Sequence, residues 1–259
     1  MDKKISVNER ITFIVFCGIL FLLFMTVMLT VPFNGAPDEA MRYQIAEYIC
    51  KYLRLPRGDD PEILNEIWGI SYAFTPINSY IISGFLMRIV SLFGVQAGNL
   101  FYYARVVSVF FSLGTAVFCY KIGKKLFKDI YIWLFVMLVT LLPEFIFISG
   151  YVNCDAIAVF SVAWIIYALL DGKENNWSTK NCIFLGAGLG WCALSYYNAY
   201  GIILFAIVYC VLSVFLDNTI ENKVTFLLQK TGWTMLAAVL VAGWWFVRNA
   251  ILYDGDILG

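Results

Sequence analysis

The stretch of sequence that decides the fold is the first long apolar run, residues 11–32, which reads ITFIVFCGILFLLFMTVMLTVP and contains no charged residue. At about 1.5 Å per residue, a helix of roughly 22 residues crosses the hydrocarbon core of a bilayer, which is about 30 Å thick. A signal-peptide core is shorter, about 7–15 residues, and ends at a small-residue cleavage site. We therefore expect a first transmembrane helix that is retained.

The composition extends this expectation to the whole chain. Of 259 residues, 61% are hydrophobic and only 14% are charged, whereas soluble domains carry about 25% charged residues. Further long apolar runs occupy residues 73–93, 99–120, 130–149, 154–170, 181–197, 199–216 and 231–252. We predict an all-α polytopic membrane protein with a single transmembrane domain over residues 1–259.

Charge and residue content disfavour several classes of function. Lys plus Arg equals Asp plus Glu, so the net charge indicates no nucleic-acid partner. The chain has no His, the commonest metal ligand and general base, and its seven Cys form no C-x-x-C pair. Carboxylates of Asp38, Glu39 and Asp155 could hold a divalent cation, but without His we predict no metal site and no cofactor.

The basic residues predict which apolar runs cross the membrane, because short cytoplasmic loops hold an excess of Lys and Arg. Lys3, Lys4 and Arg10 place the N-terminus in the cytoplasm, and the lysines of residues 121–128 place that loop there too. An even number of crossings must separate these two points, yet three apolar runs lie between them. Residues 73–93 are the most polar of the three, so we predict that they lie in the outer interface or re-enter from that side.

This assignment gives seven crossings, a C-terminus on the outer face, and one long outer loop over residues 33–99. Within that loop, the apolar residues of Glu39–Leu53 recur at helical spacing, which predicts a helix lying on the membrane surface. Gly186, Gly188 and Gly190 follow one another at every second position and predict close packing between helices.

The remaining polar residues gather at the outer ends of the predicted helices. They are Asp38, Glu39, Arg42, Arg105, Asn153, Asp155, Arg248 and Asn249. Charged residues at or inside a membrane are rare and are candidates for function. Because the topology puts all of them on one face, they predict a site at the lipid–water boundary.

Each group also has a purely structural interpretation. Asp38 and Glu39 would stabilise the N-terminus of the surface helix. Asn153 and Asp155 would cap the fourth crossing. Arg248 would extend to a lipid phosphate.

Taken in order along the chain, these motifs resemble those of GT-C glycosyltransferases, and in particular bacterial members similar to dolichyl-phosphate-mannose–protein mannosyltransferases. Asn34–Glu39, NGAPDE, is similar to the Pro-Asp-Glu motif of the family's first outer loop. Gly150–Asp155, GYVNCD, is similar to the Asn-x-Asp turn of the second outer loop. Trp244–Asn249, WWFVRN, and Tyr253–Gly259, YDGDILG, resemble the Trp-Tyr-x-Arg-Asn and Tyr-Gly-Asp-Pro-Leu-Gly ending of the seventh helix.

The resemblance implies a module of seven transmembrane helices with juxtamembrane helices in the first outer loop. It also implies transfer of a sugar from a polyprenyl-phosphate donor to an acceptor on the outer face of the cell membrane, with a catalytic Asp at Asp38 or its neighbour Glu39. We expect one of these carboxylates to act as the base toward the acceptor hydroxyl.

The other candidate residues receive roles on the same hypothesis. Arg248, aided by Arg105 or Arg42, would bind the donor phosphate, because guanidinium groups hold phosphate oxygens at two points. Residues that would orient the substrate are Asn153, Asp155 and Asn249. The expected partners are the lipid-linked sugar, membrane lipid, an acceptor and, as a candidate, a second membrane chain.

Three departures from the family pattern leave alternatives open. Arg42 stands where relatives often have His, and Ser195-Tyr196 stands where they often have Ser/Thr-Lys. Relatives continue beyond the seventh helix, so we expect the family's C-terminal region to be absent from residues 1–259. One alternative is a catalytically inert or truncated subunit of such an enzyme. A third interpretation is a lipid-linked sugar transporter or flippase, although transporters usually show internal repeats and none is clear here.

Overall fold

The computed structural model describes residues 7–258, so Lys3, Lys4 and Gly259 lie outside the described residues. Helices are the only regular secondary structure in the described residues, and a long non-helical segment separates the helix that ends at Tyr52 from the 3₁₀ turn that begins at Tyr72. The helices that run along the bundle are α1 (Val7–Thr30), α4 (Leu100–Leu126), α5 (Ile130–Thr140), α7 (Asp155–Glu174), α8 (Thr179–Ala193), α9 (Gly201–Phe215) and α10 (Lys223–Leu252). The shorter elements are α2 (Glu39–Tyr52), α3 (Asn78–Ser91), α6 (Pro143–Ile148) and the 3₁₀ turns η1 (Tyr72–Phe74), η2 (Ala97–Asn99) and η3 (Tyr197–Tyr200).

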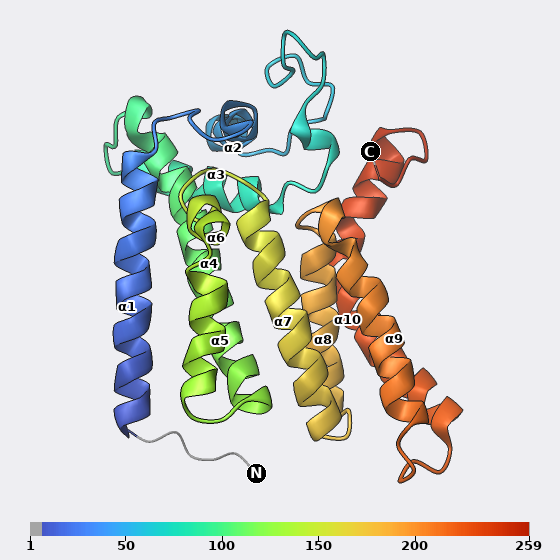
Figure 1. Ribbon diagram of the computed structural model, residues 1–259. Coiled ribbons are helices and arrows are strands. Elements are labelled where there is room, and N and C mark those ends of the chain that lie inside the picture. The colour runs from blue at the N-terminus through green and yellow to red at the C-terminus, as the bar shows by residue number, and fades with distance from the viewer. Residues whose placement is uncertain (1–6, 259) are drawn as a thin grey trace.

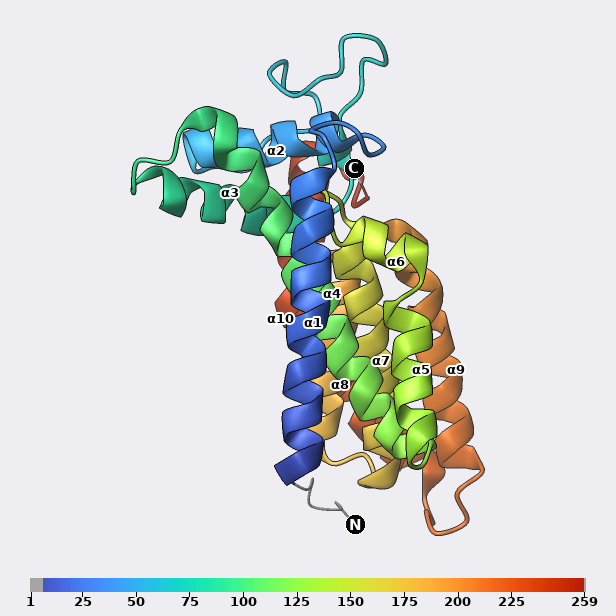
Figure 2. The ribbon, with the colours of Figure 1, turned by 60° about the vertical axis from the view of Figure 1, so that its left-hand side comes forward.

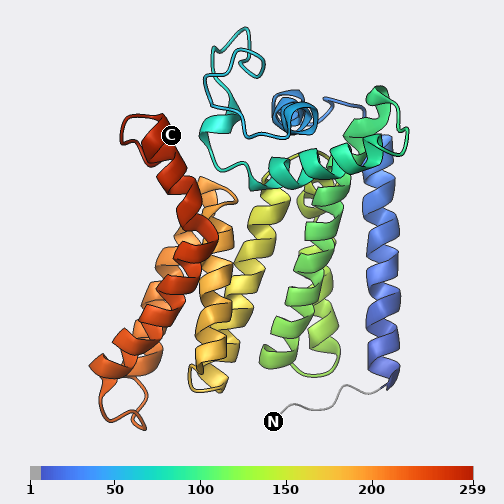
Figure 3. The ribbon, with the colours of Figure 1, turned by 180° about the vertical axis from the view of Figure 1, so that it is seen from behind.

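The long helices run side by side, and α2 and α3 lie across one end of the bundle (Figures 1 and 3). That end also holds the C-terminus, whereas the chain enters α1 at the opposite end. Helix α3 lies within the apolar run 73–93 and packs on α2 and α4 instead of running along the bundle. The prediction of juxtamembrane helices in the loop after the first helix is therefore confirmed, and α2 agrees with the predicted surface helix to within a residue at its C-terminal end.

Five helices within residues 7–258 are long and apolar enough to cross a membrane. They lie at Glu9–Thr30, Ala97–Leu126, Asp155–Glu174, Tyr197–Phe215 and Lys223–Leu252. This confirms a polytopic all-α membrane protein. The count of seven crossings stays a prediction, because α5 and α8 are shorter, with 11 and 15 residues.

The apolar run 130–149 is divided into two helices at Pro143. This residue is the first of α6, and proline lacks the N–H that would continue the hydrogen-bond ladder of α5. At 1.5 Å per residue, α5 alone covers about 17 Å, which is less than the thickness of the hydrocarbon core.

Helices α8 and α10 approach each other closely through two glycines of α8. A Cβ at Gly186 would lie 2.2 Å from the carbonyl oxygen of Thr234, and one at Gly190 would lie 2.8 Å from that of Ala238. Backbone oxygens cannot retreat from such a contact, so only glycine fits. Small residues allow this close packing in membranes, where lipid removes the hydrophobic drive between helices.

The helices across the end of the bundle are joined in the same way. A Cβ at Gly84 of α3 would lie 2.7 Å from the carbonyl oxygen of Ala46 in α2. The Ser83 hydroxyl donates a hydrogen bond to the carbonyl oxygen of Ala104 in α4, at 3.1 Å. Helix α3 packs on both α2 and α4. It therefore holds α2 and the segment that precedes α2 in place (Figure 2).

We predict that Gly186→Ala lowers the thermal midpoint of the detergent-solubilised protein, because forcing α8 away from α10 costs about 1–3 kcal/mol. The matched control is Gly232→Ala in α10, where a new Cβ meets no atom within 4 Å. The control should leave stability unchanged or raise it slightly, since alanine favours helix over glycine by up to about 1 kcal/mol. Equal effects of the two substitutions would contradict the close approach.

Candidate functional site

The centre of the polar region is a fully buried ion pair between α2 and α4. Arg105 donates from Nε to Glu39 Oε1 at 2.6 Å and from Nη2 to Glu39 Oε2 at 2.7 Å, and neither side chain is exposed. Such a two-point contact between guanidinium and carboxylate fixes the relative orientation of both groups.

The other hydrogen atoms of the Arg105 guanidinium are directed at the end of α1. Nη1 donates to the carbonyl oxygens of Met28 and Val31, at 2.8 and 2.7 Å, and Nη2 donates to that of Pro32 at 3.0 Å. All five N–H groups of the guanidinium therefore have partners inside the protein. This geometry favours a positioning role for Arg105, because no N–H group is left over for a donor phosphate.

The oxygen atoms of the Glu39 carboxylate also have all their hydrogen-bond partners inside the protein. Besides Arg105, it accepts hydrogen bonds from the backbone N–H of Asn34 at 2.9 Å and from that of Val152 at 3.1 Å. The second of these bonds ties α2 to the turn before α7. Since Glu39 is buried and accepts four hydrogen bonds, the geometry favours a positioning role over the predicted role as an alternate base.

Asp38 has the opposite environment although it is the preceding residue. Its backbone lies in the left-handed region, with φ 58° and ψ 12°, and its side chain makes no capping hydrogen bond to α2. This conformation costs an L-residue about 1–2 kcal/mol, although Asp tolerates it better than most residues. The side chain of Asp38 is exposed, so the carboxylate is available to a ligand while Glu39 is not.

Tyr72 of η1 holds the Asp38 carboxylate. Its hydroxyl donates a hydrogen bond to Asp38 Oδ2 at 2.7 Å. Burial raises the pKa of Tyr72, and the hydrogen bond to Asp38 raises this pKa further, so the phenol stays protonated and remains the donor. Sequence reasoning missed Tyr72, whose only signal is its place at the start of the apolar run 73–93.

Arg42 connects Tyr72 to α7. Its guanidinium lies 5.2 Å from the centre of the Tyr72 ring, and its Nη1 donates to Asp155 Oδ2 at 3.2 Å. The Arg42 side chain is 8% exposed and that of Asp155 is 32% exposed. The Nε of Arg42 is buried and has no hydrogen-bond partner. Arg42 thus differs from Arg105, because part of its hydrogen-bonding capacity is unused.

Asp38, Tyr72, Arg42 and Asp155 form one connected cluster, which we call the Asp38 cluster. Tyr196 lies beside it: burial raises the pKa of this phenol, and Cys154 and Asp155 raise that pKa further. The topology argument predicted that Asp38 and Asp155 share one face, and the structure joins them through Tyr72 and Arg42.

Asn153 has a structural role, as the capping interpretation of the sequence predicts. Its side-chain amide donates to the carbonyl oxygens of Ile148 and Tyr151, at 2.6 and 2.8 Å, and its Oδ1 accepts from the Ala156 N–H at 2.8 Å. The side chain is fully buried. Asn153 therefore shapes the turn before α7, and its side chain is not free to orient a substrate.

Arg248 and Asn249 lie near the end of α10, where Arg248 contacts the segment between α2 and η1 and Asn249 contacts the residues that follow α10. Arg248 Nη2 donates to the carbonyl oxygen of Pro56 at 2.6 Å, and its guanidinium lies 5.1 Å from the Trp245 ring. The buried Asn249 amide donates to the carbonyl oxygen of Leu258 at 3.2 Å. These contacts fix Asn249, while Arg248 remains half-buried.

The turn η1 connects the end of α10, which carries Arg248 and Asn249, to the Asp38 cluster. Phe74 packs on Tyr253 with ring centres 5.4 Å apart, while Tyr72 of the same turn bonds to Asp38. Gly58 makes this possible, because a Cβ there would lie 2.4 Å from the Phe74 ring. No three His, Cys, Asp or Glu side chains are grouped as a metal site within residues 7–258.

The fold and the polar centre together define a polytopic helical membrane protein whose charged residues gather at one end of the bundle. Residues 75–245 match the dolichyl-phosphate-mannose-protein mannosyltransferase family, and since this is more than half of the chain, the protein belongs to that family. The family is one of membrane glycosyltransferases of the GT-C kind, which implies a lipid-linked sugar donor. No curated protein and no solved structure matches the chain.

The matched range covers part of the site. It contains Arg105, Asn153 and Asp155, whereas Asp38 and Glu39 lie before it. The family thus supports the fold and the class of activity, and the roles of Asp38 and its neighbours depend on the geometry described above.

We predict that Arg105→Met destabilises the protein by about 3–5 kcal/mol, because it leaves the buried Glu39 carboxylate without its cation. The matched control is Arg88→Met in α3, which removes a half-buried arginine with no carboxylate partner within residues 7–258. Thermal unfolding in detergent, followed by circular dichroism, measures both. Similar midpoints for the two variants would show that the Glu39–Arg105 pair does not stabilise the fold.

Proposed function

We propose that this protein transfers a sugar from a polyprenyl-phosphate donor to an acceptor hydroxyl on the outer face of the membrane, with Asp38 as the general base. The observation that supports this most strongly is the contrast within Asp38–Glu39. Glu39 is buried and fully bonded, while Asp38 is exposed and oriented by Tyr72.

The proposed reaction has a simple balance of atoms and electrons. Asp38 accepts the proton of the acceptor hydroxyl as its oxygen bonds to the anomeric carbon of the sugar. The bond between that carbon and the phosphate oxygen breaks, and the phosphate leaves with the electron pair. The hydrogen bond from Tyr72 engages Oδ2 of Asp38, which leaves Oδ1 to take the proton.

Two arginines are the candidates for the leaving phosphate. Arg42 lies within the Asp38 cluster and has an Nε without a partner, and Asp155 holds its guanidinium in place. Arg248 is half-buried at the end of α10. Guanidinium groups near the departing oxygens would stabilise the charge that develops there, and such electrostatic contacts are often the largest contribution to catalysis.

We predict that Asp38→Asn lowers kcat by about 10²–10⁴-fold, the usual contribution of a positioned base. Tyr72→Phe should lower kcat less, with KM for the donor little changed, because it removes only the hydrogen bond that orients Asp38. The assay is transfer of radiolabelled sugar from a lipid-linked donor by protein reconstituted in liposomes, with an acceptor peptide or lipid.

The control for this experiment is Asp59→Asn, which removes an exposed carboxylate of the same outer loop whose partner is Arg57. It should leave transfer unchanged. Circular dichroism of each variant excludes misfolding. Full activity of Asp38→Asn in folded protein would refute the base assignment.

We also propose that the end of the bundle with α2, α3 and the C-terminus faces outward. The supporting observation is that the basic α4–α5 loop lies at the other end (Figure 1). In a background without native cysteines, Glu66→Cys should react with an impermeant maleimide applied to intact cells, and Lys128→Cys should react only after the membrane is opened. Both parent residues are exposed. The reverse labelling pattern would overturn the orientation and, with it, the outer location of the site.

A further inference from the structure

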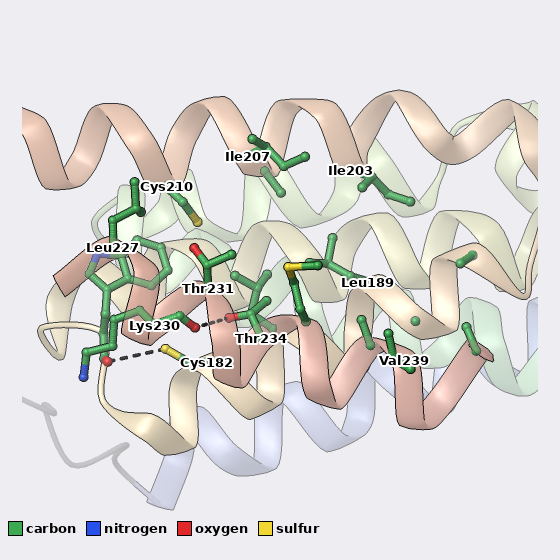
Figure 4. Close-up of a pocket in the computed structure, with 18 of the residues that line it drawn as sticks. Cys182, Leu189, Ile203, Ile207, Cys210, Leu227, Lys230, Thr231, Thr234 and Val239 are labelled. Carbon is green, nitrogen blue, oxygen red and sulfur yellow. Dashed lines mark hydrogen bonds between the residues drawn. The ribbon is translucent and has the colours of Figure 1, made fainter. Parts of the chain in front are cut away.

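A long apolar groove lies between α8, α9 and α10, away from the Asp38 cluster. It encloses about 490 Å³, and its walls carry aliphatic, aromatic and cysteine side chains (Figure 4). Leu189 lies on the α8 wall, Ile203 and Ile207 on the α9 wall, and Val239 on the α10 wall. The volume falls within the range of about 300–1,000 Å³ that is usual for ligand sites.

The shape of the groove fits a hydrocarbon chain. On α10 its lining residues extend from Leu227 to Phe246, which is about 29 Å of helix at 1.5 Å per residue. This length approaches the thickness of the hydrocarbon core, about 30 Å. A compact polar ligand would find few partners here, whereas an acyl chain would be in contact with apolar side chains along its length.

One end of the groove carries a cation, Lys230. Its ammonium lies 5.1 Å from the centre of the Phe226 ring, and within residues 7–258 no carboxylate lies at ion-pair distance from it. Two lysines of α4 differ in this respect, because Lys124 pairs with Glu9 and Lys125 pairs with Asp171 and Glu174. A charge at the edge of an apolar surface favours an anionic partner.

We propose that this groove binds one acyl chain of an anionic phospholipid, with the lipid phosphate paired to Lys230. The lipid belongs to the leaflet at the end opposite α2 and α3, which the predicted topology makes the cytoplasmic leaflet. The groove is thus a lipid site separate from the Asp38 cluster. The inference does not depend on the sugar-transfer reaction.

The position of the cation distinguishes this lipid from the sugar donor. A donor that reacts at the Asp38 cluster must hold its phosphate at that end of the bundle. Lys230 lies toward the start of α10, and α10 runs from there to the end that holds the C-terminus (Figure 1). The paired phosphate therefore lies at the opposite side of the membrane from the reacting phosphate.

The test is native mass spectrometry of the full chain in detergent, titrated with dioleoylphosphatidylglycerol or with zwitterionic dioleoylphosphatidylcholine. We expect tighter retention of phosphatidylglycerol, and a loss of about fivefold in Lys230→Gln, the factor expected for one lysine at an anionic headgroup. The matched control is Lys180→Gln, which removes an exposed lysine of α8 that does not line the groove. It should leave retention unchanged.

A second variant tests the groove itself. Ala238→Phe introduces a ring from α10 into the cavity and should abolish the preference for phosphatidylglycerol. Equal retention of the two lipids by the parent chain, or equal losses in Lys230→Gln and Lys180→Gln, would overturn the proposal. Competition by a polyprenyl phosphate at stoichiometric concentration would also overturn it, because the groove would then belong to the donor. The lysine variants decide the question even where Ala238→Phe fails to fold.

Discussion

The buried pair Glu39–Arg105 is the contact on which the rest of the site depends. Two charges removed from water are stable only when further hydrogen bonds satisfy the remaining donors and acceptors. Here the end of α1 supplies three carbonyl oxygens, and two backbone N–H groups complete the shell of the carboxylate. A single pair of side chains thereby fixes α1, α2, α4 and the turn before α7 relative to one another. Because each member is fully bonded, the network has one stable arrangement.

This rigid pair sets the position of the neighbouring carboxylate. Asp38 enters α2 in the left-handed conformation, so consecutive side chains can have opposite environments, one inside the protein and one exposed. Sites supported by packed and hydrogen-bonded residues hold their reacting groups more accurately than sites on free loops. The long segment after α2 then contributes Tyr72, whose hydroxyl donates a hydrogen bond to the exposed carboxylate.

Much of this architecture could be predicted from the sequence. The long apolar runs predicted the membrane fold. The requirement for an even number of crossings identified residues 73–93 as a segment that does not cross, and this segment lies across the end of the bundle. Helical periodicity gave α2. These features depend on local composition and on the spacing of charges, both of which can be read along one chain.

The pairing of side chains could not be predicted in the same way. Glu39 and Arg105 are separated by 66 positions, and nothing in the periodicity of either helix shows that Arg105 reaches the end of α1. Motif order suggested that Arg105 and Glu39 would meet a ligand, whereas the structure bonds them to each other. The position of Tyr72 at the edge of an apolar run is only a weak signal, because tyrosines are common at a membrane interface.

The number of internal partners divides the polar residues into two groups. Glu39, Arg105 and Asn153 are buried and their hydrogen-bonding capacity is used inside the protein. Asp38 is exposed, and Arg42 retains an unbonded Nε. A group whose bonds are complete would lose them on binding a ligand, and an unsatisfied buried group costs about 1–3 kcal/mol. Residues with unused capacity avoid that loss. Because their hydrogen bonds are complete, Glu39, Arg105 and Asn153 hold the surrounding helices in place. Contact with a ligand is thus left to Asp38 and Arg42.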